Sequence, residues 1–172
     1  HDRRARGEIP TFERLVVETT GLADPAPVIH TLMSDASLAR GYELAGVVTT
    51  VDAINGAATL AAHAESVKQA AVADRIVLTK TDMVDTPERT ETLARLRLNL
   101  ARLNPGAPVL DRAAPDFDPR HLFDTVRYDA VGKTADVRAW LNAEAYDGHG
   151  HPHGHGPDDA HGHDVNRHDG DR

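Results

Sequence analysis

The stretch that decides the fold is Ile76-Val77-Leu78-Thr79-Lys80-Thr81-Asp82, in which three apolar residues lead into a polar loop. Similar apolar runs occupy residues 15–17 and 47–51, and a weaker one occupies residues 109–110. Aliphatic and β-branched runs without polar alternation are typical of strands buried on both faces of a parallel sheet. The sequence therefore predicts four strands, the first three of which are expected to be buried on both faces.

Helical patterns separate and follow these runs. They cover residues 25–34, 53–72 (with a break near Gly56), 87–103 and 136–145. Alternating strands and helices predict an α/β fold with a mostly parallel sheet flanked by helices. Ligands bind at the carboxyl ends of the strands in such sheets, so the polar residues at those ends are candidates for function. They are Glu18, Asp52 and residues 79–82.

Two of the predicted helices carry a start signal. Asp24 and Thr86 each precede a proline, Pro25 and Pro87, at the first helical position. The side chains of Asp and Thr can accept hydrogen bonds from the free N–H groups of a first turn, and proline has no N–H to leave unpaired. We therefore expect Asp24 and Thr86 to be N-caps.

The composition excludes several classes of protein. The chain has 172 residues, enough for about one domain of roughly 100–200 residues. Its net charge of −8 argues against binding to the nucleic-acid backbone, and the lack of cysteine excludes a thiolate site within it. No apolar run approaches about 18 residues and no signal-peptide pattern is present, so we expect a cytoplasmic protein without membrane contact.

The composition changes sharply near Asp147. Residues 147–172 hold seven of the eleven histidines, together with six Asp and six Gly, and almost no aliphatic residues. Such a segment cannot bury enough apolar surface to offset the entropy lost on ordering. We expect residues 1–146 to form the folded domain and residues 147–172 to be a disordered His-rich tail.

The loop at residues 79–82 matches the guanine-reading motif [Asn/Thr]-Lys-x-Asp. A carboxylate at Asp82 can accept hydrogen bonds from the ring N–H and the exocyclic amine of guanine, a donor pair that adenine lacks. The stem of Lys80 would lie along the plane of the base. Thr79 stands where Asn is commoner, and the structural alternative is a strand that ends in a Thr/Asp turn.

An acidic residue also ends the first apolar run. Glu18 is followed three positions later by Gly21. In P-loop NTPases an acid at this place orients the Mg²⁺ shell or the attacking water, and a glycine lets its N–H approach the γ-phosphate. The alternative is a structural salt bridge of Glu18 before a capped helix, and the segment alone does not decide between them.

Taken together, the segments resemble the CobW-type GTPases, relatives of HypB and UreG. The most specific of them is Glu18-Thr19-Thr20-Gly21-Leu22-Ala23-Asp24-Pro25, and residues 47–53, 69–82 and 103–107 fit as well. The resemblance implies a P-loop GTPase that binds or delivers a transition metal, zinc or cobalt, to a client metalloprotein, with GTP and Mg²⁺ as cofactors. It implies catalytic roles for Glu18 and Gly21.

The same resemblance implies that Thr79, Lys80 and Asp82 bind guanine. The family's phosphate loop and Cys-x-Cys-Cys metal motif would precede Glu18, and its C-terminal domain would follow the His-rich tail. None of these is present, and the chain begins with His1. We therefore expect a partial GTPase domain over residues 1–146 of a longer protein, which alone binds GTP weakly or not at all and does not hydrolyse it.

The His-rich tail predicts transition-metal binding. Alternate residues of an extended chain project to the same side, so neighbouring imidazoles can converge on one ion. Neutral imidazole suits Zn²⁺, Co²⁺ and Ni²⁺, and redundant mobile ligands favour capture and hand-over. A solvated linker and a purification tag are the alternatives. The candidate ligands are His149, His151, His153, His155, His161, His163 and His168.

Other readings stay open. The chain can be a non-catalytic metal buffer that acts through its tail, or an assembly factor for a cobalt or nickel enzyme, and it can form a homo-oligomer. Gly132-Lys133-Thr134 resembles the end of a phosphate loop, but Arg127 stands where the first glycine is required. We expect His30, His63 and His121, which are isolated in the sequence, not to be ligands.

Overall fold

The computed structural model describes residues 3, 6–123, 128–129 and 131–147. Its elements in chain order are α2 (Pro25–Ser34), α3 (Ala36–Ala39), β1 (Val48–Asp52), α4 (Gly56–Ala62), α5 (Ala64–Val72), β2 (Arg75–Thr79), the 3₁₀ turn η1 (Thr81–Met83), α6 (Pro87–Leu103), β3 (Val109–Asp111), the 3₁₀ turn η2 (Pro119–Leu122) and α7 (Ala135–Asp147). No helix in the described part of the chain is long and apolar enough to cross a bilayer.

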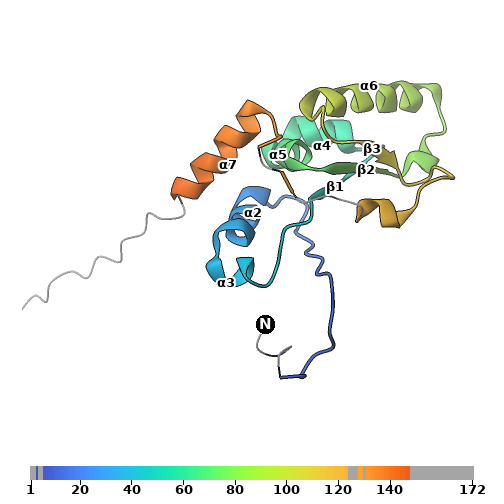
Figure 1. The fold of residues 1–172 in the computed structure, drawn as a ribbon. Coiled ribbons are helices and arrows are strands. Elements are labelled where there is room, and N and C mark those ends of the chain that lie inside the picture. Colours follow the sequence, from blue (N-terminus) through green and yellow to red (C-terminus); the bar gives the residue numbers. More distant parts are fainter. Residues whose placement is uncertain (1–2, 4–5, 124–127, 130, 148–172) are drawn as a thin grey trace, which may run out of the picture.

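Three of the four predicted strands form a parallel sheet in the order β1-β2-β3. Val48 pairs with Arg75 and Ile76 pairs with Val109, so the strands end at the same edge. Helices α4 and α5 connect β1 to β2, and α6 connects β2 to β3 (Figure 1). These crossovers confirm the predicted α/β fold.

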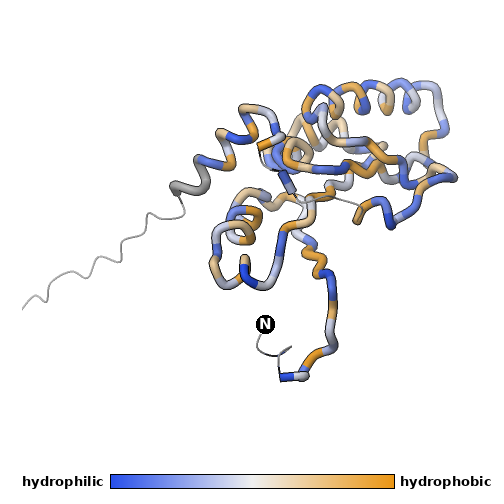
Figure 2. The backbone as a smooth tube through the Cα atoms, viewed as in Figure 1, coloured by the Kyte–Doolittle hydropathy of each residue, from blue (hydrophilic) through white to orange (hydrophobic). Residues whose placement is uncertain are grey.

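The prediction of a strand at residues 15–17 is wrong. Leu15, Val16 and Val17 form no strand and are 56–70% exposed. Figures 1 and 2 show this partly apolar segment extending away from the sheet before α2. A β-branched run forms a strand only when a neighbouring strand satisfies its backbone groups and covers its side chains. Within the described residues β1 pairs only with β2, and residues 15–17 have no such neighbour.

The helix starts agree with the cap signals. Asp24 accepts a hydrogen bond from the N–H of Ala26, and Thr86 accepts one from the N–H of Arg89. The predicted helix over residues 53–72 is two helices, α4 and α5, and the break lies at His63 rather than near Gly56. His63 adopts an extended backbone, and Gly56 begins α4 instead of interrupting it.

The main core lies between the sheet and helices α4, α5 and α6. Ile76 and Leu78 of β2 are fully buried against Leu96 and Leu100 of α6, with Val51 of β1 beside them. The leucines recur on one face of α6, as the helical period requires. This packing fixes β2, whose carboxyl end carries the loop at residues 79–82.

A second cluster attaches α7 to α2 and α5. Val137 of α7 packs with Ile29 of α2 and Val72 of α5, and Trp140 and Leu141 cover it. Val137, Trp140 and Leu141 thus lie on one face of α7.

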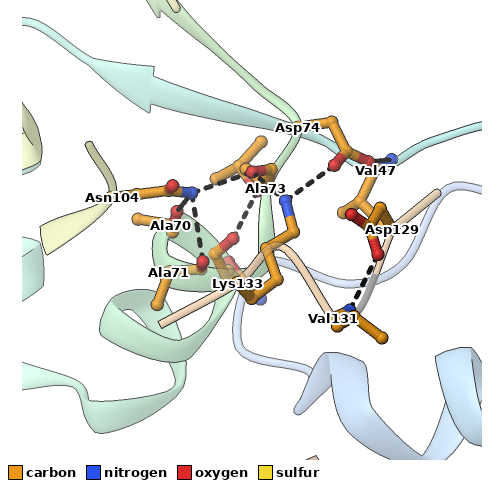
Figure 3. Close-up of polar contacts among 11 residues, drawn as sticks. Val47, Ala70, Ala71, Ala73, Asp74, Asn104, Asp129, Val131 and Lys133 are labelled. Atoms are coloured by element: carbon orange, nitrogen blue, oxygen red, sulfur yellow. Dashed lines mark hydrogen bonds and ion pairs between the residues drawn. The ribbon is translucent and has the colours of Figure 1, made fainter. Parts of the chain in front are cut away.

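Polar contacts close the amino edge of the sheet (Figure 3). The Asn104 side chain donates to the carbonyls of Ala70, Ala71 and Ala73 at the end of α5. Lys133 Nζ lies 2.6 Å from Asp74 Oδ1 and donates to the Ala73 carbonyl. Lys133 therefore anchors the chain before α7 to the edge opposite the 79–82 loop, which supports rejecting it as a phosphate-loop lysine.

Candidate functional site

The loop after β2 has an unusual backbone. Thr79 ends the strand, Lys80 has φ +60° and ψ +24°, and Asp82 lies in the η1 turn. Lys80 is the only non-glycine residue with positive φ in the described part of the chain. A left-handed conformation costs a lysine about 1 kcal/mol, so surrounding contacts must hold it.

One of these contacts comes from the end of β1. Lys80 Nζ lies 2.6 Å from Asp52 Oδ2. The other carboxylate oxygen of Asp52 accepts from the N–H groups of Ile54 and Asn55, at 2.7 and 3.1 Å. Partial burial raises the pKa of Asp52, but the Lys80 ammonium and the hydrogen bonds from Ile54 and Asn55 outweigh it and lower the pKa to about 2. Asp52 is therefore a fixed anion beside the loop.

The other side of the loop is held from the end of β3. Thr81 Oγ1 donates to Asp111 Oδ1 at 2.5 Å. Asp111 Oδ2 accepts from Arg97 of α6 at 2.8 Å. Carboxylates at the ends of the two flanking strands thus hold Lys80 and Thr81 (Figure 1 shows the strands).

Asp82 is the free carboxylate of this loop. It is exposed and forms no hydrogen bond or ion pair with any residue that the structure describes. Its oxygens can therefore accept two parallel N–H donors from a ligand. The structure brings Thr79, Lys80 and Asp82 together at the carboxyl edge of the sheet, where a ligand is expected.

The structure does not join Glu18 and Gly21 to this loop. Glu18 is exposed and has no hydrogen bond or ion pair within the described residues. Gly21 and Ala23 are tied to α5, because Gln69 Nε2 donates to both of their carbonyls, at 3.1 and 2.8 Å. A Cβ at Gly21 would meet nothing within 4 Å, so packing gives no reason for a glycine there.

The seven candidate metal-ligating histidines, His149 to His168, lie outside the described residues. Within the part of the chain that is described, no three His, Asp or Glu side chains gather into a metal site. His30, His63 and His121 accordingly belong to no such group.

Sequence reasoning missed two residues of the site. Asp111 accepts from Thr81 and Arg97 pairs with Asp111, yet neither Asp111 nor Arg97 was predicted to have a role. The signal for Asp111 was its place directly after the weak apolar run at residues 109–110. Arg97 lies on α6 and carries no signal in the sequence, since only tertiary packing brings it to β3.

Comparison with known proteins identifies the family of the chain. Residues 2–111 match the family described as CobW/HypB/UreG, nucleotide-binding domain. The chain is 40% identical over 124 residues to "Zinc chaperone YjiA" of Escherichia coli, which covers 72% of this chain and 37% of that protein. It is 31% identical over 122 residues to "Zinc-regulated GTPase metalloprotein activator 1" of Schizosaccharomyces pombe. That match covers 70% of this chain and 28% of the yeast protein.

A solved structure is similar as well. The crystal structure of Zn(II)-bound YjiA GTPase from E. coli superposes with a TM-score of 0.64 at 38% identity, covering 74% of this chain and 38% of that one. The chain thus spans about a third of the length of these relatives. The match over residues 2–111 shows that the chain belongs to the CobW/HypB/UreG nucleotide-binding family.

Proposed function

We propose that this chain is the guanine-reading part of a GTP-hydrolysing metallochaperone that delivers zinc to a client metalloprotein. The observation that carries the proposal is the unpaired Asp82 carboxylate at the carboxyl edge of the sheet. The family match and two relatives named for zinc and GTPase activity support it.

The base would be selected at Asp82. Its two oxygens would accept from the ring N–H and the exocyclic amine of guanine, a paired contact worth about 1–3 kcal/mol. Adenine has no donors at those positions. The Lys80 stem would lie along the face of the base.

Glu18 and Gly21 would serve the phosphate end. The exposed, unpartnered Glu18 carboxylate suits a residue that orders the water shell of Mg²⁺. Open space at Gly21 suits a backbone N–H that must approach a phosphate closely. Bound Mg²⁺ would neutralise charge on the β- and γ-phosphates.

Zinc would be the cargo, held by the histidines of residues 149–168. Seven imidazoles with neighbouring carboxylates supply a redundant set of nitrogen and oxygen donors, which suits Zn²⁺ and equally Co²⁺ or Ni²⁺. The same histidine content supports the second candidate, a metal buffer in which the α/β domain has no catalytic role.

The test is a change of base preference. Asp82→Asn places an amide donor opposite C2 of the base, where xanthine has a carbonyl and guanine an amine. In the intact gene product we expect the substitution to weaken GDP binding by about 5- to 150-fold and to improve binding of xanthosine diphosphate. Competition against a ribose-labelled fluorescent nucleotide measures both.

The matched control is Glu91→Gln on α6. Glu91 pairs with Arg95 on the exposed face of that helix, so its loss should leave base preference unchanged. Equal binding of GDP and ADP by the unsubstituted protein would reject guanine reading and leave the metal buffer as the function.

A further inference from the structure

Two cations linked to this loop are neutralised by carboxylates other than Asp82. Lys80, two positions before Asp82, pairs with Asp52. Arg97 pairs with Asp111, whose other carboxylate oxygen accepts from Thr81. A free ammonium in the same short loop would pair with Asp82 and compete with the N–H donors of a base. The arrangement leaves Asp82 without a partner among the described residues.

We propose that Asp52 is a positioning residue for guanine binding: it holds the Lys80 ammonium away from Asp82 and so keeps that carboxylate free. This proposal rests on the proposed function, because it concerns the same base-reading loop.

Asp52 is built to be a fixed anchor. Its Oδ1 accepts from the N–H groups of Ile54 and Asn55, and the side-chain amide of Asn55 donates to Oδ2 at 3.2 Å. These contacts fix the orientation of the Asp52 carboxylate independently of its ion pair with Lys80. With its pKa lowered to about 2, Asp52 stays ionised throughout the physiological range.

The backbone of the loop agrees with this role. Lys80 adopts the left-handed conformation, and its carbonyl accepts from the N–H of Met83 at 3.1 Å. The N–H of Ala53 donates to the Thr79 carbonyl at 2.9 Å, which joins the ends of β1 and β2. The carboxyl end of β1 thus makes two contacts with this loop: Asp52 binds the Lys80 side chain, and Ala53 binds the Thr79 backbone.

The first experiment uses Asp52→Asn in the 172-residue chain labelled with ¹⁵N-lysine. Asparagine keeps an oxygen for Ile54 and Asn55 but turns its amide, a donor, toward Lys80. The chain has three lysines, Lys68, Lys80 and Lys133. Because all three are ion-paired, the side-chain ammonium signals of Lys68 and Lys133 are internal controls of folding.

We expect only the Lys80 ammonium signal to move, toward the position of a free lysine. An unchanged Lys80 signal would overturn the proposal. If the Lys68 and Lys133 signals also move to the positions of an unfolded chain, Asp52→Asn has unfolded the protein and the milder Asp52→Glu variant, which keeps the charge, replaces it. In Asp52→Glu all three ammonium signals should return to their positions in the unsubstituted chain. A Lys80 signal that stays at the free-lysine position in this variant would also overturn the proposal.

The second experiment measures base preference in the intact gene product. Inosine diphosphate lacks the exocyclic amine that Asp82 would bind, so the ratio of GDP to IDP affinity reports this contact. We expect Asp52→Asn to weaken GDP binding by about fivefold and to reduce that ratio. Glu91→Gln, which removes an ion pair on the exposed face of α6, should change neither.

The two experiments separate the two claims. If the unsubstituted protein shows no preference for guanine, the proposed function fails, and the Lys80 signal alone decides whether Asp52 positions the lysine. If guanine preference is present and Asp52→Asn leaves it intact, Asp52 has no positioning role in base reading.

Discussion

Lys68 binds Asp24 across 44 residues of sequence, with its Nζ 2.5 Å from Oδ2. The same ammonium lies 4.8 Å from the ring centroid of Trp140. Asp24 is the N-cap of α2 and closes the segment that contains Glu18 and Gly21, whereas Trp140 lies on α7. One cation on α5 therefore contacts both the N-cap that follows Glu18 and Gly21 and the helix that precedes the His-rich tail.

Replacing Lys68 should loosen both contacts. Lys68→Met removes the ion pair and the cation above the indole, and we expect a loss of about 1 kcal/mol in the free energy of unfolding. Trp140 is the only tryptophan, so a change in its emission can be assigned directly. Urea unfolding followed by circular dichroism and by fluorescence measures both effects.

The control is Arg95→Met on α6. Arg95 pairs with Glu91 on the exposed face, one turn away, and its loss should stay within about 0.5 kcal/mol. Identical Trp140 emission in Lys68→Met and the unsubstituted chain would contradict the contact between Lys68 and Trp140.

Asn104 is expected to be the most sensitive polar residue of the core. It is 5% exposed and donates to three carbonyls at the end of α5. Asn104→Asp keeps the shape but cannot donate, and it sets a charge against those carbonyls. We expect a loss of about 3 kcal/mol in unfolding free energy, while Asn99→Asp, on the exposed side of α6, changes little. Similar urea midpoints for the two variants would show that the three hydrogen bonds do not stabilise the fold.

Gly56 is required by close packing at the start of α4. A Cβ there would lie 2.7 Å from Val51 Cγ1 and 3.2 Å from Leu96 Cδ2. Overpacking of a buried site costs about 1–3 kcal/mol, which exceeds the gain of up to about 1 kcal/mol in helix propensity. Gly56→Ala should therefore lower the melting temperature. Gly106→Ala, whose Cβ would meet only Asn104 Oδ1 at 3.9 Å, should leave it nearly unchanged; a stabilised Gly56→Ala would contradict the packing.

The Asp52–Lys80 pair predicts a pH dependence of stability. Because the folded pKa of Asp52 is lowered to about 2, the ionised carboxylate stabilises the fold above about pH 4 and loses this effect as the pH falls through 2. Lys80 is half exposed, so solvent screening limits the contribution to about 1–2 kcal/mol. The difference in unfolding free energy between the unsubstituted chain and Asp52→Asn should shrink between pH 5 and pH 2. A difference that stays constant over this range would show that the pair does not stabilise the fold.

The sequence was sufficient to predict those helices and strands for which several local signals agree. The caps Asp24 and Thr86, the helix after Pro87 and the strand before Thr79 were all predictable, because propensity, capping and burial agree there. Residues 15–17 had the same β-branched signal and failed, because a strand needs a neighbour that the run itself cannot specify.

The contacts around the loop could not be read from the sequence. The motif identified Lys80 and Asp82, but the pairing of Lys80 with Asp52 spans 28 residues and depends on the register of β1 and β2. Arg97 reaches Asp111 only because α6 packs beside β3. Such contacts follow from the sheet order, which periodicity alone does not determine.

The most direct test of a metal-coupled GTPase is a titration of the intact gene product with a fluorescent GTP analogue, with and without Zn²⁺, in the unsubstituted and Asp82→Asn forms. We predict guanine-selective binding that changes with Zn²⁺ and is lost in Asp82→Asn. Zinc uptake without any nucleotide binding would contradict the account and leave the His-rich tail as the functional part of the protein.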